Sequence, residues 1–499
     1  MKIGFISLGC PKNLVDAEVM LGLAEQAGHE ITAEAEGADV LVVNTCAFID
    51  RAKQESVDTI LEMAELKKQA AGRRLVVTGC LAERYRDELQ AQIPEIDAVL
   101  GTGDVPRIVE ALTGAPAAPA AAGGAAPMTF YQRDPGTSQP AAKRPGPTSP
   151  ARSEAARPHE DGRGEAQLAA ERPGPVFGLD LPTYIYDAET PRRLATPGHY
   201  AYLKIAEGCD YKCAFCIIPK MRGHYRSRPA ESIVREARQL ADRGVKELLL
   251  ISQDTTFYGI DRQERGALPR LLRELNRVDG LEWVRMLYLY PTTITDEVID
   301  AMAESEKVCN YVDLPLQHAS DRVLKRMKRP GTRASYERLL RRIRDRVPGV
   351  TLRTTFIVGF PGETEEDVAE LGDFIEAVGF DHLGVFTYSH EEGTSAAGLA
   401  DDVPAAVKAR RQRAIMARQK RLVRRRQKAR VGERARVLVD GPSPEHELVL
   451  TGRLAGQAPD IDPLVYLTDA DPARLRPGTL ADVEIVGARD YDLVARVLD

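Results

Sequence analysis

The stretch Glu207-Gly-Cys-Asp-Tyr-Lys-Cys-Ala-Phe-Cys-Ile-Ile-Pro219 contains three closely spaced cysteines, Cys209, Cys213 and Cys216. The spacing C-x3-C-x2-C allows three thiolates of one loop to reach one metal cluster. A four-iron, four-sulfur cluster normally takes four protein thiolates, one for each iron. With three thiolates, one iron keeps an open position at which a small molecule can bind, as in catalytic metal sites. The stretch therefore predicts a catalytic iron–sulfur cluster.

Zinc is the alternative metal for this loop. Zinc sites usually pair their cysteines as C-x2-C or C-x4-C and need a fourth ligand. His224, eight residues after Cys216, offers such a ligand. A zinc knuckle is therefore the second, less favoured hypothesis.

The length and composition are those of a multidomain globular protein. A chain of 499 residues with 43% hydrophobic residues is long enough for two to four domains. The N-terminus lacks the apolar stretch of a signal peptide, and no run approaches 18 consecutive apolar residues, so we expect no membrane span. Seven cysteines make a disulfide framework improbable in a large intracellular chain, and we expect a cytoplasmic protein.

Residues 1–113 show three apolar runs that each end in a cysteine, separated by helical patterns. The runs are GFISLGC, VLVVNTC and RLVVTGC, ending at Cys10, Cys46 and Cys80. Alternation of strand and helix predicts a parallel α/β sheet, in which ligand sites lie beyond the carboxyl ends of the strands. A single cysteine there is usually a small buried hydrophobe. Three at equivalent positions favour a second cluster with an open iron.

Residues 114–180 change character abruptly to a composition rich in Ala, Pro and Gly. Such a segment cannot bury enough apolar surface to offset its ordering entropy. We expect a disordered insertion without chemistry.

Residues 196–405 contain six further alternations of strand and helix. The strand-like runs are AYLKIAEG, ELLLISQ, WVRMLYLY, YVDLPLQ, LRTTFIVG and HLGVFTY. Six such units predict a partial TIM-type barrel with its chemistry at the carboxyl ends of the strands. The cysteine loop follows the first of these strands, where that rule requires it.

Several other polar residues are expected at the same ends of these strands. Gln253 and Asp254 end the second strand and are candidates for hydrogen bonds to a ligand, with capping of the strand end as the alternative. The segment GFPGET brings Gly359, Gly362 and Glu363 to the end of the fifth strand, and its glycines permit close backbone approach. The remaining candidates at the mouth of the barrel are Gln317, His318, Tyr388 and Glu391. His318 is a candidate proton relay, although a lone histidine is more often structural.

Four residues near these segments receive default interpretations. Lys204, Arg226 and Arg228 flank the cysteine loop and are expected at the solvated surface, with charge compensation of a cluster as the alternative. Cys309 has no neighbouring ligand in the pattern and is expected in the core.

The net charge of −6 is unevenly distributed. Residues 408–430 contain twelve Lys or Arg and no acidic residue. Four apolar residues follow seven-residue spacing there: Ile415, Met416, Leu422 and Val423. This predicts an amphipathic connecting helix over 406–430, packed by one stripe. Its cationic faces are either solvated or contact RNA or the ribosome.

Residues 431–499 form five short apolar runs separated by turns, which predicts a small closed β-barrel of the OB-like kind. This segment contains thirteen acidic residues and seven arginines. Such a balance suits a basic protein partner better than a phosphate backbone.

The cysteine loop strongly resembles that of the radical S-adenosylmethionine (SAM) enzymes, and the pattern of 196–405 matches their barrel. The resemblance implies a [4Fe-4S] cluster on the three cysteines of the loop, with SAM bound at its open iron. It also implies that Phe215 lies beside the SAM adenine and that GFPGET lines the adenine site.

Within that class, the chain is similar to the methylthiotransferases. LGCPKNLVDAE, VNTCAFI and VTGCLAERY resemble their N-terminal domain, and residues 431–499 resemble their TRAM domain. The resemblance implies that Cys10, Cys46 and Cys80 hold an auxiliary [4Fe-4S] cluster. It implies an α/β multidomain enzyme that uses SAM both as methyl donor and as radical source to replace C–H by C–SCH3.

Two branches of this family differ in substrate. LGCPKNLVDAE, SQDTTFYG and LPLQHAS resemble the branch that modifies the β-carbon of an aspartate in small-subunit ribosomal protein S twelve. That resemblance implies this protein or the ribosomal subunit as partner, and a flavodoxin-like or ferredoxin-like reductant. The alternatives are methylthiolation of isopentenyladenosine in tRNA, a non-enzymatic iron–sulfur protein that docks on ribosomes, and an oxidoreductase that relays electrons between clusters.

Overall fold

The computed structural model describes residues 1–114, 181–443 and 445–498. Apart from Gly114, the expected disordered insertion lies outside these residues. None of the helices in the described segments combines the length and the apolar character needed to cross a membrane.

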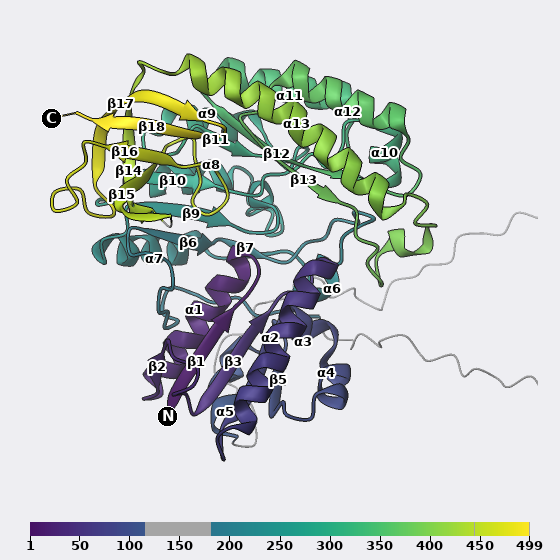
Figure 1. The fold of residues 1–499 in the computed structure, drawn as a ribbon, viewed down its shortest axis with the longest axis vertical. Helices are drawn as coiled ribbons and strands as arrows, with labels where there is room; N and C mark the ends of the chain where they lie inside the picture. The colour runs from purple at the N-terminus through teal and green to yellow at the C-terminus, as the bar shows by residue number, and fades with distance from the viewer. Residues whose placement is uncertain (115–180, 444, 499) are drawn as a thin grey trace, which may run out of the picture. The chain divides into compact units, whose positions relative to one another are not determined.

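The N-terminal segment is a parallel sheet with helices on both faces (Figure 1). Its elements are β1 (Lys2–Ser7), α1 (Pro11–Gln26), β2 (Glu30–Thr32), β3 (Val40–Thr45), α2 (Asp50–Lys68), β4 (Arg74–Gly79), α3 (Cys80–Arg84), α4 (Arg86–Gln92), β5 (Ala98–Leu100), η1 (Val105–Arg107) and α5 (Ile108–Thr113). The strand order is β2-β1-β3-β4-β5 and all pairings are parallel. The three predicted strands are confirmed, while the short edge strands β2 and β5 carry too little pattern to be predicted.

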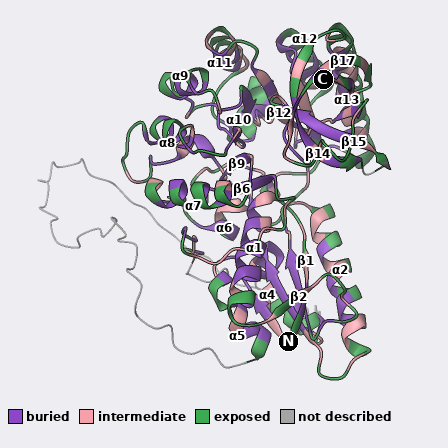
Figure 2. Ribbon diagram, turned by 90° about the vertical axis from the view of Figure 1, so that its left-hand side faces the viewer, coloured by how far each residue is buried: buried purple, intermediate pink, exposed green. Residues whose placement is uncertain are grey.

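Alternate residues of β3 enter different cores. Val40 and Val42 pack with α1 and α5, whereas Leu41 and Val43 pack with α2. A strand that is buried on both faces reads as a continuous apolar run, which is why the sequence identified it. Figure 2 shows buried strands of this sheet between α2, whose outer face is exposed, and α1, which is buried over most of its length.

The central segment is the predicted partial barrel. Its elements are β6 (Tyr200–Lys204), β7 (Ala206–Glu207), α6 (Ile218–Arg222), β8 (Arg226–Ser227), α7 (Ala230–Asp242), β9 (Glu247–Ile251), η2 (Thr255–Phe257), α8 (Ala267–Leu275), β10 (Trp283–Met286), α9 (Asp296–Glu304), β11 (Tyr311–Asp313), α10 (Asp321–Arg326), α11 (Arg333–Arg346), β12 (Thr351–Val358), α12 (Glu365–Val378), β13 (His382–Thr387) and η3 (Ser395–Gly398). Six parallel strands run as β6-β9-β10 and β11-β12-β13. A parallel bridge from Val284 of β10 to Val308 pairs the first sheet with the segment that leads into β11.

The basic segment forms one long helix, α13 (Ala405–Ala429), which runs beside α12 and β13 (Figure 1). Its buried stripe repeats every four residues and is formed by Arg411, Ile415, Gln419, Val423 and Gln427. Gln419 donates to the carbonyl of Phe380 at 2.9 Å, and Gln427 donates to that of Tyr491 at 3.1 Å. The helix is therefore packed along its length rather than solvated on all sides.

The C-terminal segment is the expected closed barrel. Its strands are β14 (Arg434–Ser443), β15 (His446–Leu454), β16 (Val465–Thr468), β17 (Leu480–Arg489) and β18 (Asp492–Val497), in the closed order β14-β15-β16-β18-β17. Buried Arg453 joins it to the central barrel, because its guanidinium lies 2.5 Å from Glu247 and 2.9 Å from Asp440.

Candidate functional site

The three N-terminal cysteines follow three neighbouring strands at one edge of the sheet. Cys10 caps α1 after β1, Cys46 follows β3, and Cys80 begins α3 after β4. Because β1, β3 and β4 are adjacent, their carboxyl ends bring the three thiols into one region. Cys10 is exposed, Cys46 is half-buried and Cys80 is buried.

Asn13 and Gly9 hold the first two of these cysteine loops together. The Asn13 amide donates to the carbonyls of Leu8 (2.7 Å) and Thr45 (3.2 Å), which lie beside Cys10 and Cys46. Gly9 has φ +95°, and a Cβ there would lie 2.8 Å from the Cβ of Cys46. Only glycine permits this backbone conformation and this approach.

The second cysteine loop is fixed by its own backbone and by aromatic packing. The Cys209 amide donates to Gly223 at 3.0 Å, and the Cys216 amide donates to the Cys213 carbonyl at 3.1 Å. Tyr211 stacks on Tyr290 with 3.9 Å between ring centroids. The loop is therefore shaped before any ligand binds.

Each set contains a thiol whose pKa is raised by burial, which favours its protonated form unless a cation is present. Burial is the main reason that the pKa of Cys80 is raised to about 12; Arg222 opposes the shift, and Cys10 and Cys46 add to it. Burial likewise raises the pKa of Cys209 to about 12. Metal ligation needs thiolates, so a metal–sulfide core, which is positively charged before its thiolates are counted, is the kind of partner that stabilises these groups.

Each set also contains a buried arginine beside a sulfur atom. The Arg222 guanidinium lies 3.4 Å from Cys80 Sγ, and that of Arg329 lies 3.6 Å from Cys213 Sγ. The Tyr290 hydroxyl is 4.0 Å from the same Cys213 sulfur. Three thiols with a compensating cation fit a cluster of net negative charge in each set.

A network of buried ion pairs connects the two cysteine sets. Asp16 of α1 accepts from Lys204 and Arg222 of the central barrel, at 2.5 Å each. Glu207 accepts from the same two cations, at 2.5 Å and 3.3 Å. Arg222 ends α6, the short helix that follows Cys216, so one guanidinium contacts both the network and the N-terminal set.

Asp254 and Gln253, the two residues after β9 that are candidates for ligand binding, differ from each other in their contacts. Asp254 is fully buried and caps η2 through the amides of Thr256 (2.8 Å) and Phe257 (3.2 Å). Its other oxygen accepts from Tyr211 at 2.8 Å, so it positions the cysteine loop. Gln253 donates to Glu207, while its carbonyl oxygen is buried without a hydrogen-bond partner among the described residues. Gln253 therefore keeps an unused acceptor for a ligand.

The GFPGET segment is held by α13. Glu363 accepts from the amide of Gly359 at 2.6 Å and pairs with Arg411 at 3.0 Å. A Cβ at Gly359 would lie 2.3 Å from the Lys408 side chain. Burial raises the pKa of Glu363 to about 7, and Arg411 opposes the shift. These contacts shape the loop. The Glu363 carboxylate is used within the protein, by the Gly359 amide and Arg411.

Phe215 and Gly362 lie in the same neighbourhood. Phe215 packs against a small apolar cluster that contains Phe360 and Tyr388. Gly362 has φ +76°, and a Cβ there would lie 2.8 Å from the Arg326 guanidinium. The structure thus brings the aromatic residue of the cysteine loop close to the GFPGET segment.

The other candidates at the mouth have structural contacts. His318 is fully buried, its Nδ1 accepts from the Ser320 amide at 2.9 Å, and burial lowers its pKa to about 4. Gln317 has φ +73° and pairs its backbone with β12. Glu391 accepts from Arg84 and Lys53 at 2.9 Å each, which ties α2 and α3 to the barrel.

The expectation that Lys204 and Arg228 are solvated is wrong. They are 2% and 1% exposed, because acidic partners at Asp16, Glu207 and Glu236 replace water. Arg226 is half-buried and donates to backbone carbonyls. Cys309 is in the core, as predicted.

Sequence reasoning missed four residues of the site: Asn13, Asp16, Glu207 and Arg222. The first two lie in the quoted motif LGCPKNLVDAE, and the others flank the cysteine loop. Their closeness in sequence to the cysteines is the signal that could have identified them.

The zinc hypothesis finds no support in the position of His224. Its side chain is 81% exposed and its ring nitrogen pairs with Asp210 at 2.8 Å. Within residues 1–114, 181–443 and 445–498, no three His, Cys, Asp or Glu side chains converge on a point that would hold a single ion. A cluster differs in this respect, because each thiolate binds a different iron.

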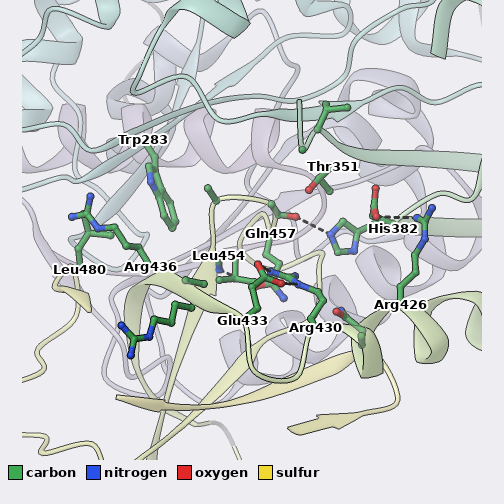
Figure 3. Close-up of a pocket in the computed structure, with 18 of the residues that line it drawn as sticks. Trp283, Thr351, His382, Arg426, Arg430, Glu433, Arg436, Leu454, Gln457 and Leu480 are labelled. Carbon is green, nitrogen blue, oxygen red and sulfur yellow. Dashed lines mark hydrogen bonds and ion pairs between the residues drawn. The ribbon is translucent and has the colours of Figure 1, made fainter. Parts of the chain in front are cut away.

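A cleft of about 800 Å³ lies at the opposite end of the barrel strands (Figure 3). It is lined by Trp283, Thr351 and His382, the first residues of β10, β12 and β13, and by α13 and the C-terminal barrel. Chemistry in such barrels occurs at the carboxyl ends of the strands, so this cleft is separate from the cysteine site.

Comparison with known families defines the class of the protein. Residues 203–375 match the radical SAM superfamily, residues 2–101 match the uncharacterized protein family UPF0004, and residues 431–498 match the TRAM domain. The fold is similar to that of the radical SAM methyltransferase TsrM from Kitasatospora setae, with a TM-score of 0.50 and 17% identity over 77% of this chain and 72% of that one. The chain is thus a radical SAM protein, a class that uses SAM and a [4Fe-4S] cluster.

Full-length relatives define the family. The chain is 47% identical to the ribosomal protein uS12 methylthiotransferase RimO of Koribacter versatilis, covering 100% of this chain and 96% of that protein. It is 48% identical to the RimO protein of Symbiobacterium thermophilum, covering 100% and 91%. The chain belongs to the RimO family of radical SAM methylthiotransferases.

The ion-pair network predicts a specific cost for removing Asp16. We expect Asp16→Asn to destabilise the protein by about 3–5 kcal/mol, because Lys204 and Arg222 lose a buried countercharge. Glu25→Gln is the matched control on the same helix, since its pair with Arg193 is more than 40% exposed. Thermal unfolding of both variants measures the difference; equal midpoints would contradict the role of Asp16.

Proposed function

We propose that the protein is a radical SAM methylthiotransferase that installs a methylthio group on the β-carbon of an aspartate of ribosomal protein uS12. The observation that carries this proposal is the pair of three-cysteine sets joined through Arg222. One set accounts for radical formation and the second accounts for sulfur transfer. The names of the full-length relatives support the same substrate.

The proposed cofactors are two [4Fe-4S] clusters and SAM. Cys209, Cys213 and Cys216 would hold the first cluster, and the N-terminal set would hold the second. When bound, the first cluster supplies the electron that cleaves SAM to methionine and a 5′-deoxyadenosyl radical, and the second supplies the sulfur of the methylthio group.

The residues of this chain would position SAM. We assign the unpaired Gln253 oxygen to a hydrogen bond with the SAM amino group or ribose. Phe215 and the backbone around Gly359 and Gly362 would flank the adenine. Arg329 and Tyr290 contact the half-buried Cys213 at its sulfur and would hold this ligand of the first cluster in position.

The charges of the described residues favour a protein substrate over RNA. Most cations of α13 are paired within the chain: Lys408 with Asp401, Arg411 with Glu363, Arg418 with Asp373, Lys420 with Asp490 and Arg426 with Asp381. The exposed cations of α13 without an ion pair among the described residues are Arg413, Arg421, Arg425 and Lys428, and any contact with ribosomal RNA would use these. The acidic C-terminal barrel suits a basic ribosomal protein.

Two further parts of the proposal follow from the chemistry. Cleavage of SAM consumes an electron, which we assign to a flavodoxin-like or ferredoxin-like reductant. We propose a cytoplasmic location because the substrate is a ribosomal protein.

A strain without the gene tests the substrate. We expect uS12 from that strain to lack the methylthio mass increment that wild-type uS12 carries, while tRNA nucleosides remain unchanged. Mass spectrometry of uS12 and of bulk tRNA nucleosides from the same cells measures both. A modified uS12 in the deletion strain would contradict the proposal, and loss of a tRNA methylthio group would favour the tRNA branch.

Cysteine variants test the division between the two sets. Cys213→Ala is expected to abolish formation of 5′-deoxyadenosine. Cys46→Ala is expected to retain it and to lose methylthiolation of uS12. Cys309→Ala is the control, because Cys309 is buried in the core away from both sets. Chromatography of 5′-deoxyadenosine and mass spectrometry of uS12 give the two readouts; equal loss of both activities in Cys46→Ala would contradict the division.

A further inference from the structure

Lys12 is a buried lysine beside the N-terminal cysteine set. It is the second residue of α1, two residues after Cys10, and it is 7% exposed. Its ammonium lies 2.8 Å from the centroid of the Tyr288 ring, on a segment of the central barrel. The lysine therefore reaches from the N-terminal sheet into the barrel.

Among the described residues, no carboxylate forms an ion pair with the Lys12 ammonium, because the neighbouring carboxylates are paired with other cations. Asp16 and Glu207 are shared by Lys204 and Arg222. Asp313 pairs with Arg353 at 2.8 Å and accepts from the Tyr288 amide at 2.9 Å. The cation–π contact alone offsets only part of the cost of burying an ammonium. The Lys12 ammonium is thus left to interact with Cys10 or with an anion that is not part of this chain.

The segment beneath Lys12 also contacts the other cysteine set. Tyr288 has φ +60°, a strained conformation for a bulky residue, which the hydrogen bond to Asp313 maintains. Two residues later, the Tyr290 hydroxyl is 4.0 Å from Cys213 Sγ. The Lys12 ammonium therefore lies beside a segment that contacts the second cysteine set through Tyr290. A substrate that reacts at both cysteine sets would have to bind near this segment.

We propose that the Lys12 ammonium binds the side-chain carboxylate of the substrate aspartate and thereby selects aspartate and orients its β-carbon. This inference rests on the proposed function and names a residue for its substrate specificity. The carboxylate is attached directly to the β-carbon, so one ion pair restricts the position of the reacting carbon. A neutral nucleoside offers no such anion at its reacting atom.

The test compares two forms of uS12, one with the target aspartate and one with asparagine in its place. Affinities are measured by anisotropy with the enzyme carrying both clusters and SAM. We expect wild-type enzyme to bind the aspartate form about tenfold more tightly or better. Lys12→Met is expected to bind both forms equally, and Lys12→Arg is expected to keep part of the preference. Lys68→Met is the control, an exposed lysine of α2.

The outcomes separate this inference from the proposed function. Wild-type enzyme that does not methylthiolate uS12 overturns the function. Wild-type enzyme that methylthiolates uS12 but binds both forms equally, or a preference that survives in Lys12→Met, overturns the role of Lys12 alone. Iron content is measured on every variant, and if Lys12→Met fails to bind iron, Lys12→Gln replaces it. Loss of iron in both variants would assign Lys12 to holding the cluster and also overturn the inference.

Discussion

The buried ion pairs of Asp16 and Glu207 with Lys204 and Arg222 are the constraint on which the site depends. An unpaired charge in a protein interior costs several kcal/mol, so the four groups are stable only together. Asp16 lies on α1 of the N-terminal segment, and the other three groups belong to the central barrel. Separating the two parts of the chain would therefore break these ion pairs. The cysteine loop is thereby tied to the N-terminal segment that carries the other three cysteines.

The surrounding contacts extend this constraint. Helix α6 continues directly from the cysteine loop, and its residues Ile217 and Met221 pack in the core of the N-terminal sheet. On another side, Glu391 binds Arg84 and Lys53 of the sheet's helices. Chemistry that needs a radical and a sulfur source at one carbon requires such a fixed arrangement, since a small displacement of reacting groups lowers the rate steeply.

Much of the fold, and the position of the six cysteines at the ends of its strands, could be predicted from sequence, because strong local patterns encode them. β3 is apolar on both faces, and the cysteines end successive strands. The ion pairs could not be predicted: Lys204 and Arg228 look like surface residues until the fold provides Asp16 and Glu236. For Asp254 the sequence left a ligand contact and a cap as alternatives; the structure shows the cap, and the bond to Tyr211 depends on tertiary structure. Residues whose partners are distant in sequence carry no local signal.

Iron and sulfide content of the anaerobically reconstituted protein tests most directly whether one chain carries two clusters. The account predicts about eight iron atoms per wild-type chain. Replacing Cys10, Cys46 and Cys80 by alanine is expected to leave about four, and so is replacing Cys209, Cys213 and Cys216. Mössbauer spectra should show [4Fe-4S] signals in each case. About four iron atoms in the wild-type chain, or zinc in place of iron, would contradict the account.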